Sequence, residues 1–318
     1  MSQHMERYRA EHEKWPQLPV FFRPWYLDVT CGYSSWDISI SVDKGGRVQG
    51  VLPYFKSSKY GIAHITMPLL TPYLGPWYIY PINPLKQVSK LSFEKKVLED
   101  LLSQIPNVSM CKMHCHPDVQ NVLSANWQGY DCLVRYTYVL HKNKEAVLWE
   151  GLDSKQRNII TSAKECFYIE RSEEISSFLV LNQKSFERTG MNTPYSELFF
   201  TNLFDALKLN NACDLYIAKD KEGIYHAGIL IVKDLKNSYC LAIGNDPRYK
   251  NSGGLPLLMW HVILESFKST KSFNFEGGMI TNIEKYFRSY GGELTPYYRL
   301  QKARNNLLKG IFTWIKKI

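Results

Sequence analysis

The chain has 318 residues, of which 45% are hydrophobic and 22% are charged, so it can bury a sizeable core and does not resemble a disordered polymer. No apolar run approaches the roughly 18–20 residues of a membrane span. The formal net charge of +9 favours an anionic partner, such as nucleic acid, a phosphate-bearing substrate or an acidic membrane surface.

The first fifteen residues, MSQHMERYRAEHEKW, alternate charges and lack the apolar stretch of a secretory signal. The seven cysteines are scattered and odd in number, which indicates free thiols and a cytoplasmic location. The sequence contains no GxxxxGK[ST], GxGxxG, GxSxG, HExxH or CxxC motif. Their absence argues against the common NTPases, dinucleotide enzymes, serine hydrolases and zinc peptidases.

Residues 37–52 (DISISVDKGGRVQGVL) and 214–230 (DLYIAKDKEGIYHAGIL) repeat one pattern. In each copy, alternating apolar residues run into a D-K-x-G turn, at Asp43 and at Asp220, as expected of a β-hairpin. A glycine follows in the second strand, and one extra residue in the second copy aligns Gly50 with Gly228. An internal repeat of this kind predicts two similar domains.

The stretch 66–80 (TMPLLTPYLGPWYIY) contains three prolines and predicts an aromatic loop between strands. In this loop, Tyr73 and Trp77 either line an acceptor pocket or form a packed lid. The segment CKMHCH, from Cys111 to His116, is typical of a strand. Alternation along a strand places its cysteines and its histidines on opposite faces, so we expect no metal site there.

Both halves close alike, with a helix, a glycine turn and an alternating strand, at Gly129 and again at Gly291. The polar residues 142–153 separate the halves. We therefore expect an α/β protein with mixed sheets, made of an N-terminal extension (1–20), a first domain (21–145) and a second domain (146–318). Helices are predicted over 91–104, 117–127, 154–166, 173–188, 195–209, 254–269, 281–289 and 302–316.

The predicted helix 154–166 carries an apolar stripe of Ile159, Ala163 and Cys166. Arg157, Thr161 and Lys164 have the same spacing on the opposite face, which is either a phosphate-binding face or an ordinary solvated face. Lys155 is a further cation of this segment.

Glu276 ends a predicted strand beside two glycines, the position at which α/β sheets bind ligands. Its carboxylate either takes a proton from an attacking amine or accepts backbone N–H groups. Lys285 and Arg288 follow on a short helix, where they either neutralise a phosphate or an oxyanion, or are surface charges. The last segment, 302–318, predicts a basic amphipathic helix that lies on an anionic membrane or docks on the second domain.

The order of four segments resembles a known family. They are Phe22 to Leu27 (FRPWYL), the loop Pro68 to Trp77, the basic helix Lys155 to Lys164, and Phe275 (FEGG) through YFRSYGG. A hairpin, a helix and a glycine turn before the last strand resemble the GNAT acyltransferase fold. A tandem of two such domains resembles the Fem-type aminoacyltransferases and the related FemAB-like or BioF2-like proteins.

The sequence departs from the family at two places. Arg288 stands where the family's F-K-x-x-F-G motif has lysine, and arginine makes bidentate contacts. The segment from Arg248 to Gly254 (RYKNSGG) is a stretched version of the coenzyme-A loop, [QR]-x-x-G-x-[GA]. A glycine turn that opens a helix is still suited to an anion.

The resemblance implies an amide-forming transferase of peptidoglycan (cell-wall) biosynthesis, in which an acceptor amine attacks an activated carbonyl without a covalent enzyme intermediate. It implies no bound cofactor, an aminoacyl-tRNA donor and a diphosphate-bearing acceptor. It makes Glu276, Lys285 and Arg288 catalytic candidates. The expected substrate- and phosphate-binding residues are Lys155, Arg157, Lys164, Tyr73, Trp77, Arg248, Gly253 and Gly254.

Two other functions stay open. One keeps the fold and uses an acyl-CoA donor to acylate an amino sugar or a lipid-linked glycan. It predicts that the N–H groups of residues 248–254 converge on one cleft. The other is a non-catalytic GNAT-like module that binds RNA or a membrane surface.

Overall fold

The computed structural model describes residues 2–59, 61–188 and 190–304. Tyr136–Thr295 form one compact unit, unit 2, and the described residues before and after them form the other, unit 1. The unit boundaries fall inside two strands, β6 (Asp131–His141) and β12 (Glu293–Ala303). The sequence predicts a domain boundary at 145/146, and this boundary stays a prediction. In the structure, the chain passes from unit 1 to unit 2 within β6 and returns to unit 1 within β12.

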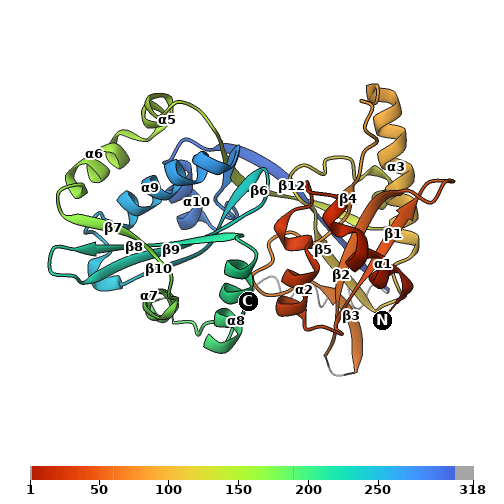
Figure 1. Ribbon diagram of the computed structural model, residues 1–318, viewed down its shortest axis with the longest axis horizontal. Coiled ribbons are helices and arrows are strands. Elements are labelled where there is room, and N and C mark those ends of the chain that lie inside the picture. Colours follow the sequence, from red (N-terminus) through yellow and green to blue (C-terminus); the bar gives the residue numbers. More distant parts are fainter. Residues whose placement is uncertain (1, 60, 189, 305–318) are drawn as a thin grey trace. The chain divides into compact units, whose positions relative to one another are not determined.

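Unit 1 holds a mixed sheet with the strand order β1-β2-β3-β5-β12, and β4 pairs with β2 (Figure 1). Its one parallel pair, β3 with β5, is joined through α3, whereas the other neighbours are antiparallel. The bounds are α1 Gln3–Glu11, α2 Pro24–Cys31, β1 Trp36–Val42, β2 Val48–Lys59, β3 Ile62–Thr66, β4 Trp77–Tyr78, α3 Gln87–Ser103, β5 Met110–His114 and α4 Leu123–Trp127.

Unit 2 has the strand order β6-β11-β10-β9-β8-β7. Its parallel pair, β10 with β11, is joined through α9, as β3 and β5 are joined through α3. The bounds are α5 Glu145–Gly151, α6 Ser154–Ala163, β7 Phe167–Ser172, α7 Ser176–Glu187, α8 Glu197–Leu209, β8 Cys213–Asp220, β9 Tyr225–Lys233, β10 Asn237–Asn245, α9 Gly254–Ser269, β11 Ser272–Asn274 and α10 Thr281–Arg288.

The two predicted hairpins are present and their turns have the same hydrogen bonds. Asp43 Oδ1 accepts from the N–H groups of Gly45 and Arg47, at 2.8 and 2.9 Å. Asp220 Oδ1 accepts from those of Glu222 and Ile224, at 3.0 and 2.9 Å. The glycine at the third turn position after each aspartate has a positive φ, +78° and +81°, which residues other than glycine rarely adopt.

The predicted alignment of Gly50 with Gly228 is wrong. Gly50 pairs with Ser41, and the matching pair in unit 2 is Ala227 with Ala218. A shift of one residue moves a side chain to the opposite face of a sheet. Accordingly, Gly50 faces Val97 and Leu101 of α3, whereas Gly228 faces Phe178 and Leu181 of α7.

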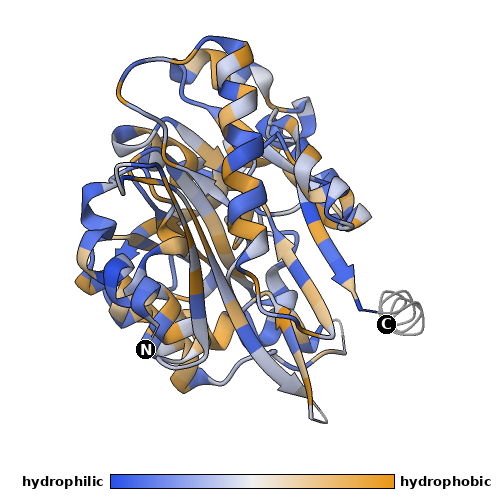
Figure 2. Ribbon diagram, turned by 90° about the vertical axis from the view of Figure 1, so that its right-hand side faces the viewer, coloured by the Kyte–Doolittle hydropathy of each residue, from blue (hydrophilic) through white to orange (hydrophobic). Residues whose placement is uncertain are grey.

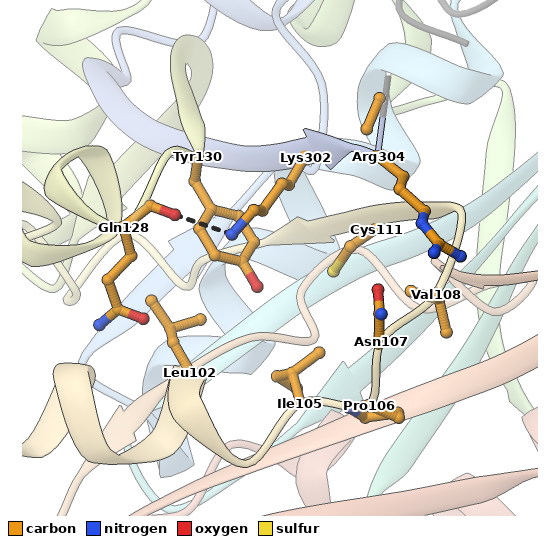
Figure 3. Close-up of a pocket in the computed structure, with 11 residues that line it drawn as sticks. Leu102, Ile105, Pro106, Asn107, Val108, Cys111, Gln128, Tyr130, Lys302 and Arg304 are labelled. Atoms are coloured by element: carbon orange, nitrogen blue, oxygen red, sulfur yellow. Dashed lines mark hydrogen bonds between the residues drawn. The ribbon is translucent and has the colours of Figure 1, made fainter.

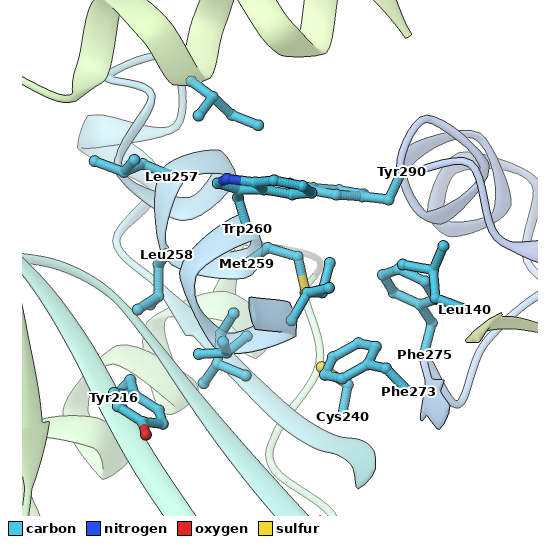
Figure 4. Packing of buried hydrophobic residues seen from close by; sticks show 14 of the residues in the cluster. Leu140, Tyr216, Cys240, Leu257, Leu258, Met259, Trp260, Phe273, Phe275 and Tyr290 are labelled. Carbon is cyan, nitrogen blue, oxygen red and sulfur yellow. The ribbon is translucent and has the colours of Figure 1, made fainter. Parts of the chain in front are cut away.

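The core of unit 2 lies on the side of the sheet that α9 covers, and α7 packs against the other side (Figure 1). Figure 4 shows Met259 and Trp260 of α9 facing the aromatic side chains that follow β11 and α10. Phe273 and Phe275 meet edge to face, with ring centroids 5.0 Å apart. In unit 1, hydrophobic and hydrophilic residues alternate along the strands (Figure 2), as expected of a sheet with helices on it.

Seven of the eight predicted helices are present, with shifted ends, whereas α1, α2 and α5 are additional. The apolar stripe expected on α6 is displaced: Ile159 and Cys166 are exposed, and Gln156, Ile160 and Ala163 are buried. The predicted helix 302–316 starts wrongly, because residues 302 and 303 belong to β12 and pair with β5. Its remainder, and with it most of the predicted amphipathic segment, lies outside the described residues. Within the described part of the chain, no helix has both the length and the apolar character to cross a bilayer.

Candidate functional site

A cavity of about 470 Å³ opens in unit 2 at the start of α6 and the end of α10. Lys155, Lys285 and Arg288, which the sequence placed among the phosphate-binding or catalytic residues, all line it. The other residues of its wall are Asp153, Gln156, Asn282, Tyr286 and Ser289.

Local bonding holds the two helix ends together. Asp153 caps α6 by accepting a hydrogen bond from the backbone N–H of Lys155 at 2.9 Å. The backbone N–H of Asp153 donates to the carbonyl oxygen of Ser289 at 2.9 Å, directly after α10. Because the first turn of α6 and the last turn of α10 are tied in this way, cations from both helices reach one cavity.

The cavity carries an excess of positive charge. Arg288 Nε donates to Glu284 Oε1 at 2.8 Å, and that oxygen also accepts from Tyr138 Oη at 2.6 Å. The Tyr138 hydroxyl, more than Arg288, holds the pKa of Glu284 below its usual range. Lys155 and Lys285 have no acidic partner among the residues that the structure describes. Two unpaired lysines beside an arginine suit a phosphate or another anion.

A network of polar groups joins the cavity wall to the interior: Gln156 and Tyr290 are buried and Tyr286 is half-buried. Gln156 Nε2 donates to Tyr290 Oη at 2.7 Å, and the hydroxyl groups of Tyr290 and Tyr286 lie 2.9 Å apart. Burial raises the pKa of both tyrosines, so both stay protonated. Gln156 and Tyr286 of this network also line the cavity. Sequence reasoning missed all three residues, although Gln156 lies four residues before the buried Ile160 on one helical face.

Glu276 does not line this cavity. It follows β11 with a left-handed φ of +56°, a strained conformation for a residue other than glycine. The N–H of Glu276 donates to Asn274 Oδ1 at 3.0 Å. Burial raises the pKa of the Cys240 thiol, and the negative charge of Glu276 raises it further. The two glycines after it permit close packing: a Cβ on Gly277 would lie 2.6 Å from the Phe287 ring, and one on Gly278 would lie 2.6 Å from the Tyr136 carbonyl.

The structure separates Arg157 and Lys164 from Lys155. Arg157 Nη1 donates to the carbonyl oxygens of Glu150 and Leu152, at 2.9 and 3.0 Å, and thereby binds the end of α5. Lys164 Nζ lies over the Trp149 ring, 5.3 Å from its centroid. Both cations therefore support the packing of α5 on α6 and do not line the cavity.

Arg248, Gly253 and Gly254 lie in the turn that opens α9. Arg248 Nη2 binds the buried Asp246 at 2.7 Å, and this contact keeps the pKa of that carboxyl far below its usual value. Gly253 has a φ of +85°, and a Cβ there would lie 2.9 Å from Ala163 Cβ. The N–H of Gly254 donates to Ser252 Oγ at 3.3 Å.

Two backbone N–H groups of this turn already donate to acceptors within the turn itself. The N–H of Ser252 donates to the Tyr249 carbonyl at 3.0 Å, in addition to the bond from Gly254 to Ser252 Oγ. Ser252 Oγ also lies 3.0 Å from His226 Nδ1, whose Nε2 contacts Asp220 Oδ2 at 2.9 Å. The N–H groups of Ser252 and Gly254 therefore do not point together at a ligand.

Tyr73 and Trp77 lie in unit 1, where both are buried in an aromatic cluster. His116 stands edge-on to both rings, with centroids 5.2 Å from each. Tyr297 of β12 contacts Tyr73 in the same way, at 5.3 Å. This packing matches the lid that the sequence offered as the alternative to a pocket.

A second cavity, of about 350 Å³, lies in unit 1 beside the end of β12 (Figure 3). Lys302 Nζ donates to the Gln128 carbonyl at 2.8 Å and lies over the Tyr130 ring. Cys111 lines the same cavity, and burial raises its thiol pKa to about 12. Within the described ranges, no three His, Cys, Asp or Glu side chains gather as a metal site would require. This cavity unites none of the predicted site residues.

Comparison with known proteins adds to this geometry. Residues 153–275, which start at the cap of α6, match the family described as acetyltransferase (GNAT) domain. The structure of FemX is similar over 91% of this chain and 95% of that chain, with a TM-score of 0.66 and 14% identity.

The C-terminal domain of a putative lysylphosphatidylglycerol synthetase from Agrobacterium fabrum is also similar, over 98% and 96%, with a TM-score of 0.55 and 9% identity. L-PGS from Bacillus licheniformis matches over 90% and 88%, with a TM-score of 0.51 and 12% identity. No curated protein matches the sequence.

Proposed function

We propose that this chain joins an aminoacyl group to an amine of a peptidoglycan precursor, because residues 153–275 match an acetyltransferase (GNAT) domain and the fold is similar to that of FemX. The observation that carries the proposal is the cationic cavity of Lys155, Lys285 and Arg288. An acceptor that bears a diphosphate matches a cavity lined by three cations and one carboxylate, Asp153, better than a neutral sugar does. The donor is aminoacyl-tRNA, whose phosphates suit a chain with a net charge of +9.

In the proposed reaction the acceptor nitrogen attacks the ester carbonyl of the donor. The new C–N bond forms as the C–O bond to the tRNA 3′ end breaks, and the amine proton passes to the departing hydroxyl. Lys285 and Arg288 would stabilise negative charge on the acceptor phosphates or on the developing oxyanion. Glu276 stays a candidate base, and the alternative, a structural carboxylate that accepts backbone N–H groups, is favoured by its absence from the cavity wall.

A second candidate uses acyl-CoA as the donor. It is favoured by the description of the matched family as an acetyltransferase and by the glycine turn that opens α9. The internal bonding of the Ser252 and Gly254 amides argues against it, because these groups would otherwise be available for a pyrophosphate.

One titration separates the two donors. Fluorescently labelled bulk aminoacyl-tRNA is titrated with the purified chain at two salt concentrations, with acetyl-CoA as competitor. Binding that weakens with salt and is unaffected by acetyl-CoA supports the aminoacyl-tRNA donor. Absence of tRNA binding, or its displacement by acetyl-CoA, would transfer the assignment to an acyl-CoA-dependent N-acyltransferase.

A further inference from the structure

The first turns of α3 and the loop before them carry large apolar side chains that nothing in unit 1 covers. Ile82 is 102% exposed and Val88 is 77% exposed, and Leu91 is exposed one turn further along the helix. The burial of α3 in unit 1 begins only at Glu94, so the helix start stands out from the unit (Figure 1).

The same surface continues onto α4. Ser124 Oγ donates to the Lys95 carbonyl at 3.1 Å, which holds α4 against α3. Lys95 Nζ lies over the Trp127 ring, 4.7 Å from its centroid, and the ring itself is 59% exposed. Leu123 is exposed at the start of α4. We call this surface the α3 patch: Ile82, Val88, Leu91, Leu123 and Trp127 with Lys86, Lys90, Lys95 and Lys96.

The α3 patch carries more cations than acids: Lys90 lies 3.7 Å from Glu94 and Lys95 lies 4.0 Å from Glu99, whereas Lys86 and Lys96 have no acidic partner among the described residues. No acidic residue occurs between Pro81 and Phe93, where Lys86 and Lys90 are both exposed. The next acid, Glu94, is buried and accepts hydrogen bonds from Tyr80 and Asn121, so that it only partly offsets the exposed charge of Lys90. Lysines around exposed aliphatic and indole groups are the composition of surfaces that lie in the interface of an anionic bilayer.

We propose that the α3 patch docks this protein on an anionic lipid bilayer, with Ile82 and Val88 inserted among the acyl chains at the headgroup boundary. Lysine side chains can extend from the edge of the patch toward lipid phosphates. Trp127 has the amphipathic ring that favours the same depth. The proposal goes beyond the proposed transferase reaction and does not depend on it, because it uses unit 1 alone and none of the cavity residues.

The test is flotation of the full chain with vesicles of phosphatidylglycerol and phosphatidylcholine (3:7) and with phosphatidylcholine alone. We expect flotation with the anionic vesicles only, weakened by salt. Ile82→Ser with Val88→Ser should lower the partition coefficient at least 10-fold. The matched control is Leu198→Ser with Leu209→Ser, which removes two apolar side chains of similar exposure from α8. All four side chains are exposed, so the thermal midpoint should not change.

A second pair of variants tests the charge. Lys86→Gln with Lys90→Gln should weaken binding to anionic vesicles several-fold, whereas Lys142→Gln with Lys144→Gln, also exposed, should not. The other basic segment, 302–318, is tested with a variant of the full chain in which Gln replaces Lys309, Lys316 and Lys317. Equal flotation of the α3 patch variants and their controls would overturn the proposal. So would loss of flotation in the Lys309, Lys316 and Lys317 variant alone, or no flotation of the unmodified chain.

Discussion

At the level of single residues, the structure distinguishes the cations that line the unit 2 cavity from other predicted phosphate-binding cations that pack elsewhere. Lys155, Lys285 and Arg288 reach one space, whereas Arg157 and Lys164 bind the end of α5 and the Trp149 ring. Helical spacing predicted that Arg157 and Lys164 share a face. It could not show which of them would be taken by the carbonyl groups of a neighbouring helix.

Lys285→Gln and Arg288→Gln should each lower kcat/KM for amide formation about 10- to 100-fold. Hydrogen bonds to charged groups contribute roughly 1.5–3 kcal/mol, and 1.4 kcal/mol corresponds to a factor of ten. Arg288→Lys should retain most of the activity because it keeps the charge. Lys221→Gln, an exposed lysine in the β8–β9 turn, is the control. Full activity of both cavity variants would remove the cavity from the mechanism.

His114 gives the unfolding free energy a pH dependence of predictable sign. Burial, and then the charges of Arg135 and Lys112, lower its pKa to about 3, and its Nδ1 lies 3.2 Å from the Pro72 carbonyl. In the unfolded chain the imidazole takes up a proton near pH 6.5. The unfolded state therefore binds more protons between pH 6.5 and 3, and stability falls as the pH falls through this window.

His114→Asn should reduce that loss, which is at most about 1.4 kcal/mol per pH unit for one group. Urea denaturation between pH 7 and 4.5 measures it, with the exposed His4→Asn as the control. Identical slopes for the wild type and the His114 variant would contradict the assignment.

At the level of elements, the hairpins and most helices were predictable because their signals are local. The D-K-x-G turn contains the aspartate that accepts the turn amides and the glycine that takes the positive φ. The short α5 and the charged α1 lack such signals. Tyr8 and Met5 are the buried residues of α1, too few for a visible period.

Two glycines with nearly the same positive φ should respond differently to alanine. Gly46 has a φ of +78° and open space around a Cβ, so Gly46→Ala should cost about 1–2 kcal/mol from backbone strain alone. Gly291 has a φ of +77°, but a Cβ there would lie 2.5 Å from the Gly151 carbonyl oxygen. Gly291→Ala should cost about 1–3 kcal/mol more, since backbone must move. Equal denaturation midpoints for the two variants would argue against this contact.

At the level of the whole molecule, the closing strand of each sequence half pairs in the other unit. β6, which closes the first half, pairs with β11 in unit 2, and β12, which closes the second half, pairs with β5 in unit 1. The repeat predicted the closing strands but not their partners. Local pattern fixes where a strand occurs, whereas its pairing depends on contacts between distant segments.

Separate fragments cut at the predicted boundary, 1–145 and 146–318, should therefore fail to fold alone. The first lacks the strand that covers β5, and the second lacks the strand that covers β11. Exposed strand edges favour aggregation. Size-exclusion chromatography and circular dichroism of each fragment, and of the two mixed after co-refolding, measure this. Two stable, monomeric fragments would contradict it.

The exchange of closing strands also sets an order of events during synthesis. Thr137 on β6 bonds to Asn274, which is made 137 residues later, and Arg135 bonds to Tyr297, made 162 residues later. Neither sheet can be completed on the ribosome until almost the entire chain has emerged. Such distant contacts slow folding, and the nascent protein would depend on chaperones that shield open β-edges for most of its translation.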